Sequence, residues 1–159
     1  MGHTSWLNDE EMRAWLAFIP SANLVLRELD QQLKEDAGLS HLQYEILMRL
    51  NEAERGAMRM TELAERLINS KSGLTYQIGQ MEKAGLVRRR PCEWSKSGIL
   101  AEITDEGRTT LERAAPGHVA AVRALLIDVL TPEERKVIAE ALGRVRDRIV
   151  QEKDGGTCW

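Results

Sequence analysis

The residues of this chain best suited to chemistry are cationic side chains gathered between positions 60 and 100. Seven basic and four acidic residues fall in this stretch, so it carries a net charge of +3 within a chain whose net charge is −3. Concentrated positive charge attracts phosphate groups even when the chain as a whole is acidic. A random scatter of charge on a solvated surface is the alternative. The basic residues are Arg66, Lys71, Lys83, Arg88, Arg89, Arg90 and Lys96.

Catalytic and metal-binding chemistry finds no comparable support in the sequence. No Ser/His/Asp or Cys/His arrangement occurs at a recognisable spacing, which predicts that the protein is not an enzyme. The three histidines, His3, His41 and His118, are far apart, and the two cysteines form no CxxC pair. We therefore expect no metal site, no disulfide framework and no cofactor.

Cys92 and His118 each have a distinctive position in the sequence. Cys92 lies beside the arginines, and neighbouring positive charge lowers the pKa of a thiol. A redox-responsive protein acting through Cys92 is therefore an alternative interpretation. His118 follows Pro116-Gly117, and we expect it to be a structural histidine with its hydrogen bonds satisfied.

Two short helical patterns and two strands surround the basic residues. The helices are expected at 61–68 and 70–84, capped by Thr61 and Ser70, with a short strand at Arg59-Met60 before them. Gly85 ends the second helix, the arginines begin a strand, and residues 99–103 alternate as its partner after a polar loop. A helix, a turn, a second helix and a basic hairpin are typical of DNA-binding proteins that place one helix in the major groove.

The second of these helices has one apolar and one polar face. Leu74, Ile78 and Met81 fall within about 60° of one another at 100° per residue, so they should be buried. The opposite face carries small and polar side chains near its N-terminus. The helix also contains two glycines, Gly73 and Gly79, and each lowers helix propensity by roughly 1 kcal/mol. A partner that must approach the backbone closely would explain this cost.

The candidate DNA contacts come from this polar face and from the basic hairpin. Neighbouring side chains in a strand point to opposite faces, so Arg88 and Arg90 are expected to face DNA, while Arg89 packs along its stem or pairs with an acid. A solvated face is one alternative, and a winged-helix protein-interaction module without DNA, which needs an apolar face, is another. The full set is Ser70, Lys71, Ser72, Gly73, Thr75, Tyr76, Gln77, Lys83, Arg88, Arg90 and Lys96.

Longer amphipathic helices flank this region on both sides. The first is expected from about Leu7 to Lys34, with Asn8 as its cap, Gly38 as its stop, and Pro20 kinking or splitting it.

The remaining helices should begin at strong caps. Ser40 and Gln43 have the spacing of a capping box, Thr104 caps a helix with a kink at Pro116-Gly117, and Thr131 opens the last helix.

The chain as a whole has the properties of one helix-rich domain or one intertwined protomer. It is 159 residues long with 30% charged residues, and it has no run of the ~18 apolar residues that a membrane span needs. Its first residues do not resemble a secretion signal. We therefore expect a cytoplasmic protein without a membrane partner.

Three motifs give the chain a family resemblance. They are SKSGLT at 70–75, QMEKAGLVRRRPC at 80–92 and LAEITDEGR at 100–108. In this order and spacing they are similar to the MarR family of winged helix-turn-helix transcription regulators, and the resemblance spans nearly the whole chain. It implies a mainly α, α+β winged-helix fold of about six helices with a small β-hairpin wing.

The resemblance also implies partners and a division of labour. Residues 1–39 and 105–159 would form the dimerisation region, so that the N- and C-terminal helices build a homodimer. Residues 40–104 would bind double-stranded DNA at a pseudo-palindromic operator, as in a repressor. A small, often phenolic, effector would bind in a crevice and thereby release the DNA. The candidate residues that line this crevice are Trp15, His41 and Tyr44. Core or dimer packing is the alternative, and the favoured one for Trp15.

Two positions depart from the family pattern. Tyr76 stands where the family often has an arginine after the SGLT threonine, and Ser95-Lys96-Ser97 stands where the wing usually has Asp-x-Arg. Either Lys96 or an arginine of 88–90 then supplies the charge of the wing, or the wing binds DNA more weakly. Sequence reading is expected to fall mostly on the short side chains around Ser72 and Thr75.

Overall fold

The helices and strands follow the order expected for a winged helix. The computed structural model describes residues 6–67, 71–92 and 98–154, and these fall into two compact units divided between Val119 and Ala120. The α-helices of the described ranges are α1 (Asp9–Ala37), α2 (His41–Glu52), α3 (Met60–Arg66), α4 (Lys71–Lys83), α5 (Asp105–Val122) and α6 (Pro132–Asp154). The strands are β1 (Ala57–Arg59), β2 (Val87–Pro91) and β3 (Ile99–Ile103). The predicted fold class is confirmed.

A small antiparallel sheet carries the basic hairpin. Its strand order is β1-β3-β2, so the hairpin of β2 and β3 gains a third strand at its β3 side. Val87 pairs with Ile103, and Glu102 lies between Arg88 on one side and Ala57 on the other. The third strand was expected at Arg59-Met60 and lies slightly earlier.

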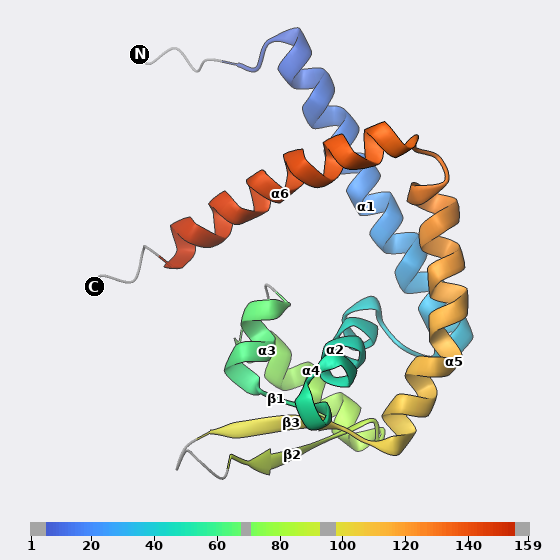
Figure 1. Cartoon of the computed structure of the whole chain (residues 1–159), viewed down its shortest axis with the longest axis vertical. Coiled ribbons are helices and arrows are strands. Elements are labelled where there is room, and N and C mark those ends of the chain that lie inside the picture. Colours follow the sequence, from blue (N-terminus) through green and yellow to red (C-terminus); the bar gives the residue numbers. More distant parts are fainter. Residues whose placement is uncertain (1–5, 68–70, 93–97, 155–159) are drawn as a thin grey trace. The chain divides into compact units, whose positions relative to one another are not determined.

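The core of the first unit lies between this sheet and the short helices. In Figure 1, α2, α3 and α4 lie over one face of the sheet. That face presents Met58, Val87, Ala101 and Ile103, none of them more than 4% exposed. Burying one such side chain contributes about 1.5–3 kcal/mol, so α4 is held mainly by its apolar face. The largest fully buried side chains are Leu33, Leu39, Ile46, Leu47, Leu50, Leu63, Leu74, Ile78, Met81 and Val87.

The predicted caps of the flanking helices are present. Asn8 and Ser40 each form a complete capping box, and Gly38 ends α1 in the left-handed region with φ of 68°. In the second unit, Thr131 and Glu134 exchange the same pair of hydrogen bonds at 2.8 and 3.2 Å. These ends are determined by local hydrogen bonds, which explains why sequence spacing predicted them.

Some predicted boundaries were wrong. Of the two alternatives at Pro20, a kink or a split, the split is excluded, because α1 continues from Asp9 to Ala37. Thr61 does not cap α3, because β1 passes directly into the helix and the extended Arg59 takes the cap position without a side-chain bond. The sequence also gave no warning of Arg55, a non-glycine residue at φ of 59° in the 3-10 turn Glu54–Gly56. The expected cap of α4, Ser70, lies outside the described residues.

The second unit contains the end of α5, the segment that follows it and α6. A π-helical segment, Arg123–Ile127, follows α5 and ends where Asp128 donates its N–H to the Arg123 carbonyl. Within the described ranges no single helix is long and apolar enough to cross a membrane, although one bent pair in the α5–α6 stretch meets the criteria by length and composition only.

The junction of β3 and α5 depends on a glycine. The Thr104 hydroxyl donates to the Gly85 carbonyl at 2.6 Å and accepts from the Gly107 N–H at 3.0 Å. A Cβ on Gly107 would come within 2.2 Å of the Leu86 carbonyl oxygen and 2.8 Å of the Ile103 side chain. The first turn of α5 therefore packs directly on the backbone that ends α4.

Gly107→Ala is expected to lower the free energy of unfolding by about 2–3 kcal/mol, because the backbone of Leu86 cannot move aside cheaply. Gly79→Ala is the matched control, since a Cβ there meets nothing within 4 Å, and it should raise stability by up to about 1 kcal/mol. Chemical denaturation of the two variants measures both effects. Equal stabilities of the two variants would contradict the packing described at Gly107.

Candidate nucleic-acid interface

The apolar face of α4 is buried and the opposite face is open to solvent. Leu74 and Ile78 are 0% exposed and Met81 is 1% exposed. Ser72, Thr75, Gln80 and Lys83 are exposed, Tyr76 is 64% exposed, and Gly73, Gln77 and Gly79 are intermediate. The predicted orientation of this helix is confirmed. Its outward face is polar apart from the Tyr76 ring, which is not the apolar surface that a protein-interaction module would need.

Gly79 leaves the backbone of α4 uncovered in the middle of the outward face. A Cβ at this position would meet no atom within 4 Å. Packing inside the described part of the chain therefore does not require a glycine here, although glycine weakens a helix by roughly 1 kcal/mol relative to alanine. The position is consistent with close approach of a partner to α4.

Arg89 lies on the helix side of the sheet and is paired with an acid, as expected from strand alternation. Its guanidinium is 2.8 Å from Glu82 near the end of α4, and its backbone N–H donates to the same carboxylate at 3.1 Å. These hydrogen bonds lower the pKa of Glu82. Arg89 thus joins β2 to α4, although its side chain is still 39% exposed.

Arg88 and Arg90 lie on the other face of the sheet, where they share one carboxylate. Glu102 Oε2 is 2.9 Å from Arg88 Nε and 3.1 Å from Arg90 Nε. The hydrogen bond from Arg88, followed by the charges of Arg90, Arg88 and Arg108, lowers the pKa of Glu102. The Arg88 side chain is nevertheless 66% exposed. Two arginines therefore share one carboxylate, and another anion can compete with Glu102 for them.

The tip of the wing falls outside the described residues. Lys96 lies in that gap, and the side chain of Lys71 is likewise not described. Cys92, at the edge of the gap, is 6% exposed, and its N–H donates to the Gly98 carbonyl at 2.8 Å. Burial counts against the redox alternative, because a sensing thiol must be reached by its oxidant.

Two of the three candidate effector residues lie together. The Tyr44 ring is 4.3 Å from the ring of His118 between centroids, and the His41 ring is 5.7 Å from it. Tyr44 is 6% exposed and His118 is 9% exposed, and burial raises the pKa of the Tyr44 hydroxyl. Three aromatic rings with polar edges, two from α2 and one from α5, therefore lie close together.

His118 was not among the predicted site residues, and the expectation that its hydrogen bonds are satisfied was wrong. Its Nδ1 is buried and has no hydrogen-bond partner within the part of the chain that the structure describes. Burial lowers the pKa of this imidazole, and the nearby His41 lowers it further. The available signal was the neighbouring Gly117, which marks close packing at this point of α5: a Cβ there would come within 2.7 Å of Asp36 Oδ2.

Trp15 does not belong to this cluster. Asp30 on α1 accepts the His41 N–H at 3.0 Å, and Trp15 lies fifteen residues earlier on the same helix, or ~22 Å along its axis. Trp15 is 52% exposed. Trp15 therefore lies away from His41 and Tyr44 and outside the buried core of the first unit.

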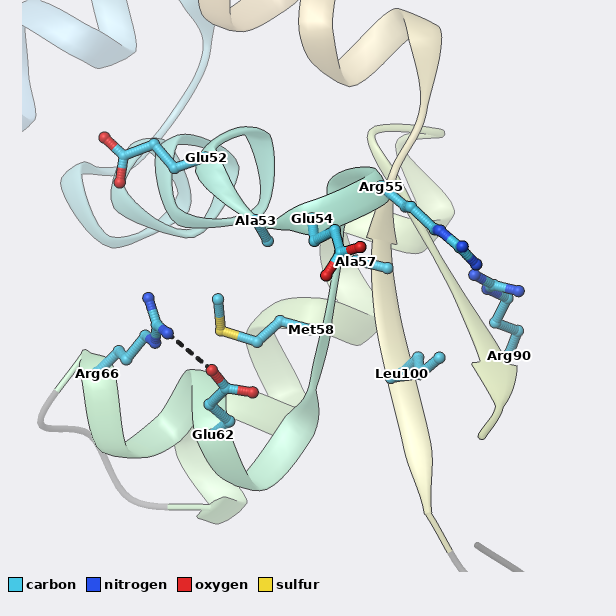
Figure 2. Close-up of a pocket in the computed structure, with 10 residues that line it drawn as sticks. All are labelled: Glu52, Ala53, Glu54, Arg55, Ala57, Met58, Glu62, Arg66, Arg90 and Leu100. Atoms are coloured by element: carbon cyan, nitrogen blue, oxygen red, sulfur yellow. Dashed lines mark hydrogen bonds and ion pairs between the residues drawn. The ribbon is translucent and has the colours of Figure 1, made fainter. Parts of the chain in front are cut away.

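A hollow of about 520 Å³ opens elsewhere, beside β1 and the 3-10 turn. Figure 2 shows Arg55 and Arg90 extending toward the same end of it, while Arg66 bonds Glu62 at 2.8 Å on the opposite wall. Its charged lining of both signs does not suit a phenolic effector. The hollow is therefore not the predicted crevice.

Comparisons with known proteins agree with this geometry. A sequence profile described as the MarR family matches residues 39–96. The HTH-type transcriptional repressor YetL of Bacillus subtilis (strain 168) is 32% identical over 117 residues, which are 74% of this chain and 70% of that protein.

Two solved structures from Streptomyces coelicolor are similar over nearly their whole length. One is Sco3205, a MarR family transcriptional regulator in complex with DNA, with a TM-score of 0.89 and 42% identity over 91% of this chain and 94% of that one. The other is AbsC, a MarR family transcriptional regulator, with a TM-score of 0.89 and 40% identity over 92% and 98%.

The lowered pKa of His118 predicts a loss of stability in mild acid. Below about pH 6.5, the ordinary pKa of histidine, the unfolded chain takes up a proton that the folded chain holds off, so unfolding becomes more favourable as the pH falls. Denaturation at pH 7.5 and 5.5 should show this loss, and His118→Leu should reduce it. Titration of the ring protons by NMR gives the direct check, and a pKa for His118 at or above 6.5 would contradict the prediction.

Proposed function

The chain belongs to the MarR family of transcriptional regulators, and on this basis we propose that it binds a pseudo-palindromic operator in double-stranded DNA as a homodimer. Members of this family are regulators of transcription and not enzymes, so the prediction of a non-enzymatic regulator is confirmed. The observation that carries the proposal is the polar outward face of α4, held in place by its buried Leu74, Ile78 and Met81 side. A structure 42% identical to this chain, Sco3205, is in complex with DNA.

The side chains of α4 divide into two roles under this proposal. Ser72 and Thr75 read base edges, because their short polar side chains let the helix enter the major groove, and the longer Tyr76 side chain adds a contact beside them. Gln77 lies at the flank of this face. Lys71 and Lys83 neutralise phosphates from the two ends of the helix. Ser70 and Gly73 are proposed as further DNA contacts beside Lys71. The exposed backbone at Gly79 supports close approach of the DNA.

The arginines of β2 act as phosphate contacts that exchange partners. Arg88 and Arg90 are held by the single carboxylate of Glu102 in the free protein. A DNA phosphate offers each guanidinium a charge-assisted pair without requiring Glu102 to serve both. Lys96 is proposed to add charge from the tip of the wing.

Exposed apolar side chains support a homodimer. Trp15, Leu16 and Phe18 on α1 are 52%, 59% and 42% exposed. In the second unit, Val137 and Val145 on α6 are 63% and 51% exposed. Apolar residues repeated in this way on a helix mark an interaction surface. We assign dimerisation to 1–39 and 105–159 and DNA binding to 40–104.

Release by a small phenolic effector is the regulatory part of the proposal. The unpartnered Nδ1 of His118 can accept a hydrogen bond from a phenol hydroxyl, beside the rings of His41 and Tyr44. A redox-responsive regulator through Cys92 is the second candidate, and the burial of that thiol disfavours it.

Gly79→Ala is expected to weaken binding to duplex DNA by roughly tenfold, or ~1.4 kcal/mol, while leaving the fold intact or more stable. The added methyl group meets no protein atom, so any loss must arise from the partner. Fluorescence anisotropy with a labelled duplex of mixed sequence measures it. Unchanged affinity would place the DNA away from this part of α4.

Arg90→Ala should weaken binding to all sequences similarly and reduce the slope of log K against log salt by about one, because one phosphate contact is lost. Arg123→Ala is the control: it removes the same charge from a residue paired with Asp128 in the second unit. A change in sequence preference with an unchanged salt slope would exclude the phosphate role.

Val145→Glu combined with Ile149→Glu should convert the dimer to monomers, because two charges would be buried in an apolar contact. Ile149 is 48% exposed in the single chain, so the monomer itself should tolerate the change. Sedimentation velocity measures the outcome, with Arg146→Glu as the control on the same helix. A double variant that sediments as a dimer would remove α6 from the interface.

A further inference from the structure

A hydrogen bond between two glutamines joins α2 to α4. The Gln43 Nε2 amino group donates to Gln77 Oε1 at 3.2 Å, across 34 positions of the sequence. Both side chains are of intermediate exposure, and Gln77 lies at the edge of the buried face of α4. The bond therefore sits where the α4 surface begins to turn toward solvent.

The direction of this bond is fixed by the backbone at the beginning of α2. The Ser40 N–H can only donate, and Gln43 Oε1 accepts it at 3.1 Å, while the Ser40 hydroxyl accepts the Gln43 N–H at 3.2 Å. Because Gln43 turns its oxygen to Ser40, the atom that it presents to Gln77 is the amino nitrogen, which can only donate. Gln77 must therefore turn its oxygen toward Gln43.

The same constraint determines what Gln77 offers to a partner. Its Nε2 amino group, a donor with two hydrogens, has no hydrogen-bond partner in the described ranges. We propose that Gln43 is a positioning residue that fixes the Gln77 amide, so that α4 presents a donor to the DNA at this position. This inference rests on the proposed function, because it assigns a specificity to one residue of that interface.

A donor at this position selects among base edges. In the major groove, guanine offers the acceptors N7 and O6 and thymine offers O4, whereas cytosine offers only the N4 donor. Adenine is usually read by a glutamine that accepts from N6 and donates to N7 together, and here the oxygen is held by Gln43. Gln77 should therefore favour guanine or thymine over cytosine at one position in each half-site.

Gln43→Glu tests the proposal, because it reverses the polarity and preserves the cap. Glutamate is the usual partner in a capping box, so one carboxylate oxygen still accepts the Ser40 N–H. The other oxygen cannot donate, and it should attract the Gln77 amino group and turn the Gln77 oxygen outward. In duplexes selected from a random pool, the preferred base should change from guanine or thymine to cytosine or adenine. The ratio of affinities at that position should shift on the order of tenfold.

The Gln77→Met background separates this effect from the added negative charge. Gln43→Glu should change no base preference there, because the amide that it reorients is absent. Gln43→Met is the second variant: it removes the donor without adding charge, and should relax the preference at the same position rather than invert it. Thermal unfolding of each variant verifies that α2 is still folded.

Two results would overturn the inference and leave the proposed function standing. One is a wild-type protein that selects a defined sequence while Gln43→Glu weakens all sequences equally. The other is a shift in preference that persists in the Gln77→Met background. A wild-type protein that enriches no sequence would instead contradict the proposed function, and the inference with it.

Discussion

Burial of the apolar side of α4 is the interaction on which the rest of the site depends. Leu74, Ile78 and Met81 are enclosed by a core that α2, α3 and the sheet build together. A helix fixed along one face has no freedom to rotate, so the identity of its outward residues is set by packing. The wing is tied to the same helix by the pair of Arg89 and Glu82. Recognition surface and core are in this sense one structure.

A series of hydrogen bonds links α4 to the region of the His41, Tyr44 and His118 rings. Asp30 on α1 accepts the N–H of His41, the neighbouring Ser40 and Gln43 form the cap of α2, and Gln43 reaches Gln77 on α4. The residues nearest the proposed effector crevice are thus adjacent to those that orient the edge of α4. A change in the position of the α2 terminus would alter both the proposed crevice and the contact with Gln77 on α4. This connection is a physical route by which the proposed effector would release DNA.

The sequence predicted those features that local rules determine. The buried face of α4, the caps at Asn8, Ser40 and Thr131 and the separation of Arg89 from its neighbours follow from periodicity and spacing alone. The sharing of Glu102 by Arg88 and Arg90 depends on the register of two strands, and the approach of His118 to Tyr44 depends on how α5 packs. Thr61 failed as a cap because β1 continues directly into α3. Contacts between elements distant in sequence were the part that could not be read in advance.

The central claim, that α4 enters the major groove in a two-fold arrangement, is tested most directly by dimethyl sulfate footprinting. The reagent methylates guanine N7 in the major groove and adenine N3 in the minor groove. On a duplex selected from a random pool, we predict two patches of protected guanine N7 whose centres are one helical turn apart, ~34 Å along the same face of the DNA. Protection confined to adenine N3, or a single patch without a symmetric partner, would contradict the account.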